Sequence, residues 1–516
     1  MGQPIRVYSR HETYTYLGHK FNIAGEWGEQ IQELSCDYKN RIDLIDSSPL
    51  PVVMKLEAIR EVALAKIQHL FANVHIPQNV LQDMNNKTVE AVRRWLGLNI
   101  HSTRDVLFLS HKEGGLGVPN VEWTYTTTRL THLIRMLNND DATVRELARA
   151  SLLLDLRRRK VPLATAVQEN FLGFRKKGNG KLDTQAAGYG VRSDWPDLND
   201  LCNRAAVRLK WEKGNSHTAP DASDAVVTDP SVNVDATVYH NGTQQTLHNT
   251  TARTSLLNIK QAETKQHWTG LRLQGKLACL DFADHSVSHS MYRNAAVGED
   301  ILCFTVKARL QVLPTKYNLA LWYPNTHHPH CIMHSNPNQH LESIAHIVNG
   351  CNKYKGLYTA RHDRIVDLIS STVKGVFPPN VSMYKHSRIM PDWFNSSDDV
   401  FCNIPNTPDV VFLDKVKREV VVLEVACVYD LYMDIAFLDK LTKYQPIVAK
   451  MRDLGYTCKM VVLIFGSLGH VHKLSVSGLR LAGLSKRQSK QLAKFCSVSA
   501  AIGSLAVWRR RCFLYP

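Results

Sequence analysis

The chain has 516 residues, of which 44% are hydrophobic and 21% are charged. This balance predicts a globular protein of several domains and excludes a largely disordered chain. Lys and Arg total 63 against 47 Asp and Glu, so the net charge is +16, which favours a polyanionic partner such as nucleic acid. No apolar run is long enough to span a membrane, and the N-terminus lacks the pattern of a signal peptide, so neither membrane insertion nor secretion is expected.

The predicted elements change character along the chain. A β-rich start is followed by helical segments whose apolar residues repeat at spacings of three and four. The C-terminal third predicts a small α/β domain in the order helix, strand, strand, helix, strand. The expected ranges are 1–30 for strands, 50–100 and 123–160 for helices, 361–374 for a helix, 410–413 and 420–428 for strands, a helix that carries Ile435 to Val448, a strand over 460–465, and a basic helix that begins near Ser485.

Charge is distributed unevenly. Residues 451–516 contain eleven Lys or Arg and one acid, whereas residues 214–252 contain no Lys or Arg and are rich in Ser, Thr, Asn, Asp and Pro. The polar stretch is predicted to be a linker or an exposed insertion at a domain boundary.

Two carboxylates in the α/β region form the first candidate site. Asp409 precedes one strand and Glu424 lies within the next, so a hairpin would bring both to one edge of the sheet, where they could hold Mg²⁺ or Mn²⁺. Lys440 and Lys443 lie on one face of the following helix and could stabilise charge on a phosphate. The alternative for Asp409 is an ordinary turn residue after proline. Glu424 resists such an interpretation, because VVVL precedes it and VACV follows it.

A second candidate site consists of Cys331 and His334 followed by His346 and Cys351. Two close pairs of such ligands suit a tetrahedral Zn²⁺. Other histidines are nearby, so the identity of the His ligands is open, and the alternative is a surface His cluster with two core cysteines.

The basic tail is the third candidate. Lys486, Lys490 and Lys494 recur every four residues beside Arg487, and Arg509, Arg510 and Arg511 follow Trp508. A helix would present the first group as a stripe along a phosphate backbone, although a solvated helix face has the same pattern.

In their order along the chain, these motifs resemble the C-terminal half of the polyprotein of site-specific non-LTR retrotransposons, the type with a restriction-like endonuclease. The matching motifs are Tyr16-Leu17-Gly18, Gly114 to Pro119, Leu273-Gln274-Gly275, Leu313-Pro314-Thr315, the four Cys and His positions, Arg361-His362, Pro408-Asp409, Glu424 and Lys440-x2-Lys443-Tyr444.

The resemblance implies a multidomain α+β fold. The implied parts are the end of a reverse-transcriptase palm over 1–30, a thumb-like helical region over 31–160, a linker region over 161–325, a zinc knuckle over 326–353 and a restriction-endonuclease-like α/β domain over 354–516. Asp409, Glu424, Lys440 and Lys443 would be the catalytic residues, and Arg361, His362 and the basic tail would contact nucleic acid. The implied partners are double-stranded target DNA and the element RNA, in the nucleus.

This sequence departs from the family pattern at three points. His334 stands where the family usually has Cys, Ala426 stands where a general nuclease signature has Lys, and the palm aspartates of the polymerase have no counterpart in this sequence. We therefore expect a DNA-nicking endonuclease that serves target-primed reverse transcription, without polymerase activity. The alternative is a non-catalytic nucleic-acid-binding remnant or a co-opted element protein.

Overall fold

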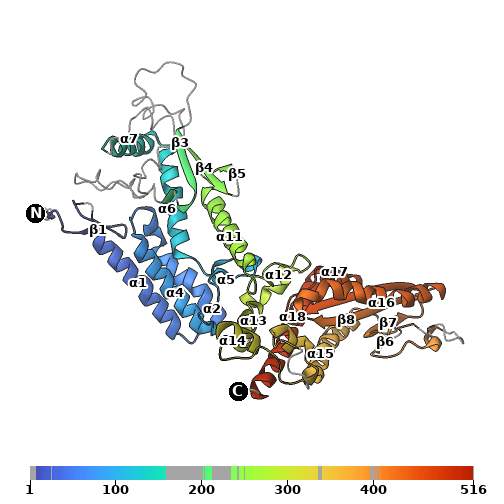
Figure 1. Cartoon of the computed structure of the whole chain (residues 1–516). Coiled ribbons are helices and arrows are strands. Elements are labelled where there is room, and N and C mark those ends of the chain that lie inside the picture. Colours follow the sequence, from blue (N-terminus) through green and yellow to red (C-terminus); the bar gives the residue numbers. More distant parts are fainter. Residues whose placement is uncertain are drawn as a thin grey trace, which may run out of the picture. The chain divides into compact units, whose positions relative to one another are not determined.

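A computed structural model describes residues 7–24, 26–158, 201–202, 204–211, 234–240, 243–248, 250–334, 340–394, 401, 404–405 and 407–514. The fold is α+β and mostly helical (Figure 1). It divides into two compact units, of which the first comprises Met1–Leu50, Lys55–Val92 and Val118–Thr264 and the second comprises Pro51–Met54, Arg93–Gly117 and Lys265–Pro516.

The first unit begins with a β-hairpin, as predicted. Strands β1 (Tyr14–Tyr16) and β2 (His19–Phe21) pair in antiparallel register. The two turn residues, Leu17 and Gly18, both have positive φ (48° and 80°), a backbone twist that suits a two-residue hairpin.

The helices that follow confirm the ranges expected over 50–100 and from 123 to 158, whereas the helix Gly28–Ser47 was not predicted. Their bounds are α1 Gly28–Ser47, α2 Val52–Ala58, a π-helical segment Ile59–Leu64, α3 Ala65–Gln68, α4 Gln78–Leu96, α5 Asp105–Phe108, α6 Val121–Leu137 and α7 Ala142–Arg158. In the first unit, Tyr38 of α1 is fully buried and its hydroxyl lies 2.8 Å from Thr88 Oγ1 of α4.

The second half of the polar stretch 214–252 contains two strands, whereas the sequence predicted a linker or an exposed insertion. Strands β4 (Val234–His240) and β5 (Thr243–Thr246) lie within it and form a three-stranded antiparallel sheet with β3 (Val207–Trp211). Val234, Ala236 and Val238 are buried, because they alternate along β4 and face one side of this sheet. Their spacing of two was the signal in the sequence, and the polar composition around them obscured it. Residues 214–233 lie outside the described part of the chain.

The second unit contains a four-stranded mixed sheet in the order β6-β7-β8-β9 (Figure 1). Strands β7 (Val410–Asp414), β8 (Glu419–Val428) and β9 (Thr457–Gly466) confirm the predicted strands, whereas β6 (Ser382–Lys385) was not predicted. β8 pairs antiparallel with β7 and parallel with β9. Both faces of the sheet are covered, which is why β7 is buried along its whole length.

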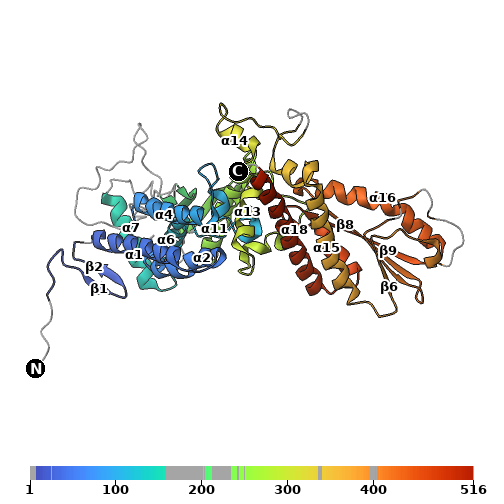
Figure 2. The same ribbon diagram turned by 90° about the horizontal axis from the view of Figure 1, so that it is seen from below.

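Helices α15 (Lys355–Lys374), α17 (Lys473–Leu481) and α18 (Lys486–Leu514) supply the core on one face of this sheet, and α16 (Met433–Asp453) supplies it on the other. Figure 2 shows α15 and α18 side by side. Four α-helices of the described chain lie between β5 and α15: α11 Ala252–Gly270, α12 His285–Ser288, α13 Glu299–Arg309 and α14 Lys316–Trp322.

Helix α18 begins where the sequence predicted. Ser485 Oγ accepts a hydrogen bond from the Gln488 amide (3.3 Å), and Gln488 Oε1 accepts one from the Ser485 amide (3.0 Å), which is a capping box. Among the described helices, α18 alone has the length and apolar content to cross a membrane, but 61% of the stretch concerned is buried inside the protein. Burial of this kind is what a core helix shows.

Candidate metal and nucleic-acid sites

The β7–β8 hairpin brings Asp409 and Glu424 together. Val410 of β7 is paired with Leu423 of β8, so the residue before β7 lies opposite Glu424. The Asp409 amide donates to Glu424 Oε2 (3.3 Å), and the Val425 amide donates to Asp409 Oδ2 (2.7 Å). The two carboxylates are therefore held by the backbone of the adjacent strand, and the Glu424 side chain is only 2% exposed.

Helix α16 presents its two lysines differently. Lys440 forms an ion pair with Glu424 Oε1. Lys443 instead donates to the Tyr444 hydroxyl (3.0 Å), and its ammonium lies 4.6 Å from the centre of that ring. Tyr444 in turn donates to the Thr407 carbonyl (3.1 Å). Lys440 is thus the lysine in contact with Glu424, whereas Lys443 contacts Tyr444.

His362 on α15 is also part of this cluster. Its Nε2 lies 3.1 Å from the Val425 carbonyl oxygen and 3.5 Å from Asp409 Oδ2, and its Nδ1 lies 3.0 Å from Asp363 Oδ1. Carbonyl and carboxylate oxygens accept hydrogen bonds, so these neighbours favour the doubly protonated, cationic imidazole. Burial alone would lower its pKa, but the hydrogen bonds with Asp409 and Asp363 raise it to about 9.

His386 and Asp363 complete the cluster, and the sequence analysis assigned neither. His386 follows β6 with a positive φ of 46°, and its Nδ1 lies 3.6 Å from Asp409 Oδ1. Its amide donates to the Asp409 carbonyl (2.8 Å). The local signal for Asp363 was its position beside His362, whereas His386 directly follows β6, a strand that the sequence did not predict.

The two carboxyl groups have opposite shifts. Burial raises the pKa of Glu424, and the negative charge of Asp409 raises it further, against the opposing effect of Lys440. For Asp409, burial acts to raise the pKa, but the hydrogen bond and charge of His362 and the Val425 amide hold it below its ordinary value. Two adjacent carboxylates with pKa values driven apart are typical of functional sites.

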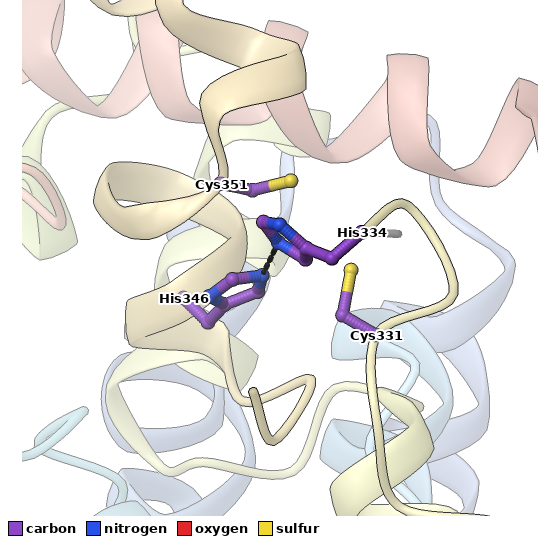
Figure 3. Close-up of side chains that lie close together, drawn as sticks. All are labelled: Cys331, His334, His346 and Cys351. Carbon is purple, nitrogen blue, oxygen red and sulfur yellow. Dashed lines mark hydrogen bonds between the residues drawn. The ribbon is translucent and has the colours of Figure 1, made fainter. Parts of the chain in front are cut away.

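The Cys/His cluster brings together all four predicted ligands, Cys331, His334, His346 and Cys351. Their ligand atoms all lie within 4.8 Å of one another. Figure 3 shows both sulfurs and both imidazoles turned toward a shared space, with His334 Nε2 3.1 Å from His346 Nε2. A tetrahedral zinc ion takes two thiolates and two imidazole nitrogens, so this donor set can hold Zn²⁺.

Local structure explains how the two ligand pairs meet. The Cys331 amide donates to the His340 carbonyl (2.8 Å), which closes the loop of the first pair. A π-helical turn, His346–Gly350, leads to Cys351, whose amide donates to the His346 carbonyl. Cys331 and Cys351 share a hydrophobic core with Ala426 of β8, so the cluster is packed against the α/β sheet.

His340 stacks on His346 (centroids 5.4 Å apart), while His328 and His330 contact each other. The geometry thus favours His334 and His346 as the imidazole ligands.

The basic tail separates into exposed and buried members. Lys486, Arg487 and Lys494 are exposed and Lys490 is half-buried, as a nucleic-acid face requires. Arg510 is exposed beside Phe513, and Arg509 is exposed but paired with Asp300 (2.5 Å).

Arg511 and Arg361 do not fit the expected role of surface contacts. Arg511 is 7% exposed and its Nη2 lies 2.6 Å from Glu342 Oε1. Arg361 is 2% exposed, and its Nη1 donates to the Val348 carbonyl (3.0 Å) and to Ser504 Oγ (2.7 Å). Both guanidinium groups stabilise the packing of the unit, because a buried cation needs such acceptors.

Fold and site together define a multidomain α+β protein with a basic C-terminal helix and a Cys/His cluster able to hold zinc. Comparison with known proteins finds similarity to the polyproteins of one class of mobile element. The chain is 26% identical over 140 residues and, in a second protein, 21% identical over 227 residues to Pol polyproteins from the type-1 retrotransposable element R2 of Popillia japonica. These matches cover 27% and 44% of this chain, and 19% and 45% of the relatives.

A Pol polyprotein from the type-2 element R2DM of Drosophila melanogaster is 27% identical over 124 residues, or 24% of this chain and 11% of the relative. No protein-family model matches the chain. The chain therefore spans less than half the length of these relatives, and the similarity supports a retrotransposon-derived polyprotein.

Proposed function

We propose that this chain is a metal-dependent DNA endonuclease of a retrotransposon polyprotein. The observation that carries the proposal is that Glu424 of β8 contacts both Asp409, which precedes β7, and Lys440 of α16. Phosphodiester hydrolysis uses such a set, because carboxylates bind the metal and a fixed cation stabilises charge on the phosphate.

The donor set fits a hard divalent cation. Asp409 and Glu424 offer carboxylate oxygens side by side, and such oxygens are the ligands that hard divalent cations prefer. Lys440 pairs with Glu424 and His362 with Asp409, so positive charge already surrounds both carboxylates. Mg²⁺ or Mn²⁺ bound by these oxygens would polarise the phosphodiester and lower the pKa of water.

The protein's own residues have separable roles in this proposal. Lys440 would neutralise charge on the phosphate, and Lys443 would contact an adjacent phosphate. His362 is a positioning residue, because it fixes Asp409 through one ring edge and is itself fixed by Asp363. The exposed part of the basic tail would hold nucleic acid, and the nicked strand of the double-stranded target DNA would prime reverse transcription of the element RNA in the nucleus.

The test is a nicking assay with the full chain on a supercoiled plasmid library carrying random inserts. We expect nicked circles with Mg²⁺ or Mn²⁺ and none with EDTA. Glu424→Gln, which keeps the size of the side chain and removes its charge, should retain duplex affinity and lose nicking. A chain that binds duplex DNA but nicks with neither metal would instead be a non-catalytic nucleic-acid-binding protein.

A further inference from the structure

A cavity of about 870 Å³ lies along the first half of α18, within the second unit. Its walls are α18, the segment of α12 and the turn after it, and the loop that begins at His111. The volume is within the roughly 300–1,000 Å³ of ligand-binding pockets. Neither the carboxylate site nor the Cys/His cluster contributes to its lining, so it is a separate site.

The cavity is strongly cationic. Five basic side chains line it and no carboxylate does; they are Lys112, Arg293, Arg487, Lys490 and Lys494. Within the described part of the chain none of the five has an ion-pair partner, so their charge is available to a ligand. The last three recur at i, i+3 and i+7 on one face of α18 near its N-terminus, where the helix dipole adds further positive potential.

Two histidines of the cavity, His285 and His289, add no charge to it. Burial lowers the pKa of His285 and brings that of His289 well below its ordinary value, with Lys265 and Arg309 respectively acting in the same direction. Both rings are therefore neutral at pH 7, and they add hydrogen-bonding groups to a wall whose net charge is positive.

An exposed aromatic side chain lies among the cations. Phe495 lines the cavity next to Lys494 and is 55% exposed. The neighbouring wall position at the next turn is Val498. A ligand for this wall must therefore combine anionic groups with a flat apolar surface, and nucleotides have both.

The phenyl ring distinguishes between two forms of nucleic acid. In a duplex the faces of the bases are covered by their neighbours, so a duplex could use the cations but not Phe495. In a single strand the base faces are accessible and stack on aromatic side chains, while a positive groove follows the backbone.

We propose that this cavity binds a single-stranded nucleic-acid segment, with one base stacked on Phe495 and the flanking phosphates against Arg487, Lys490 and Lys494. The proposal deepens the proposed function and rests on it for the presence of a nucleic-acid partner. It assigns the basic half of α18 to an unpaired strand, which is the form that DNA takes where a duplex is opened and that RNA takes outside its helices.

Binding of fluorescein-labelled (dT)12, (U)12 and a 20-base-pair duplex to the full chain tests this. Phe495→Ala should weaken binding of the single strands about tenfold, since stacking contributes on this scale, and should change duplex binding less than twofold. Phe495→Trp should retain single-strand binding. Phe513→Ala is the matched control, because Phe513 is 77% exposed on the same helix and does not line the cavity. The ratio of (dT)12 to (U)12 affinity identifies which strand the site prefers.

A charge test complements the aromatic one. Lys490→Glu with Lys494→Glu should reduce single-strand binding more than tenfold, whereas the same change at the exposed Lys415 and Lys417 should not. Unchanged affinity for both single strands in Phe495→Ala would overturn the proposal, as would equal losses for duplex and single strand. A chain that binds (dT)12 through Phe495 but never nicks would retain this inference and lose the proposed endonuclease.

Discussion

The Cys/His cluster and the carboxylate site are both candidate metal sites, yet they are built in different ways. The cluster takes its ligands from two short loops, each supplying a pair that is close in the sequence. The carboxylate site takes single residues from four segments: α15, the position before β7, β8 and α16. Sheet register brings Asp409 beside Glu424, and the packing of the two helices brings His362 and Lys440 to them. A site built from local pairs can be recognised by spacing, whereas a site built by register requires the strands to be identified first.

The largest expected effect separates the two sites completely. Asp409→Asn should reduce nicking by about a hundredfold or more, because it removes a charged metal ligand, and it should leave the zinc content at about one per chain. Plasmid nicking and elemental analysis of the same preparation measure both quantities. Loss of zinc in this variant would contradict the separation of the two sites.

A substitution in the Cys/His cluster should affect both sites. Cys351→Ser should abolish zinc binding and increase amide hydrogen exchange around residues 340–355, because metal binding at such a site is coupled to folding. Since Cys351 shares a core with Ala426 of β8, we also expect nicking to fall, by about tenfold. Exchange and zinc content unchanged from wild type would show that the four side chains do not hold a metal.

The two lysines sharpen the account of the carboxylate site. Lys440→Ala should lower the nicking rate by about a hundredfold, since a positioned cation acts where charge develops. Lys443→Ala should lower it less, because its ammonium contacts Tyr444 and not a carboxylate. Single-turnover nicking rates on one intact target sequence compare the two variants. A larger loss of rate in Lys443→Ala would reverse these roles.

The charge on His362 should have a smaller effect, on the pH dependence of folding stability measured without metal. Its pKa of about 9 in the folded protein lies above the ordinary 6.5, so protonation stabilises the fold. That contribution is complete below about pH 6.5 and is lost as the pH rises through 9. Urea unfolding in EDTA should show a decline in stability between these values in wild type, and His362→Gln should weaken it. An equally steep decline in His362→Gln would assign the effect to other groups.

The last prediction concerns the basic tail, which belongs to neither metal site. Charge reversal at Lys486, Arg487 and Lys490 should make the dependence of log affinity for single-stranded DNA on log salt concentration shallower by about 2 units, at roughly 0.7 for each phosphate that the protein no longer neutralises. Charge reversal at Arg361 is not a suitable equivalent, because that guanidinium is buried. A slope identical to wild type would return the stripe to an ordinary solvated helix face.

The sequence predicted more of the backbone than of the side-chain environment. Strands β7, β8 and β9 were recognisable because they are buried on both faces and therefore continuously apolar, whereas β6 is short and only partly buried. Without β6, nothing indicated that His386 would meet Asp409. Arg361 and Arg511 were interpreted as surface cations because composition cannot show that Val348, Ser504 and Glu342 would provide buried acceptors. Residues 161–200, the first part of the expected linker region, lie outside the described part of the chain.

The position of Arg361 beside His362 has a consequence for how the chain can change over evolutionary time. Successive residues on α15 point about 100° apart, and here one bonds to Val348 near the Cys/His cluster while the next bonds to Val425 of the sheet. Gly503 leaves room for Arg361, because an added Cβ would lie 2.5 Å from its Cγ. Insertion or deletion of one residue between Cys351 and Arg361 would rotate both side chains out of place. This stretch should therefore accept substitutions but keep a constant length, so that the two sites are inherited as a single block.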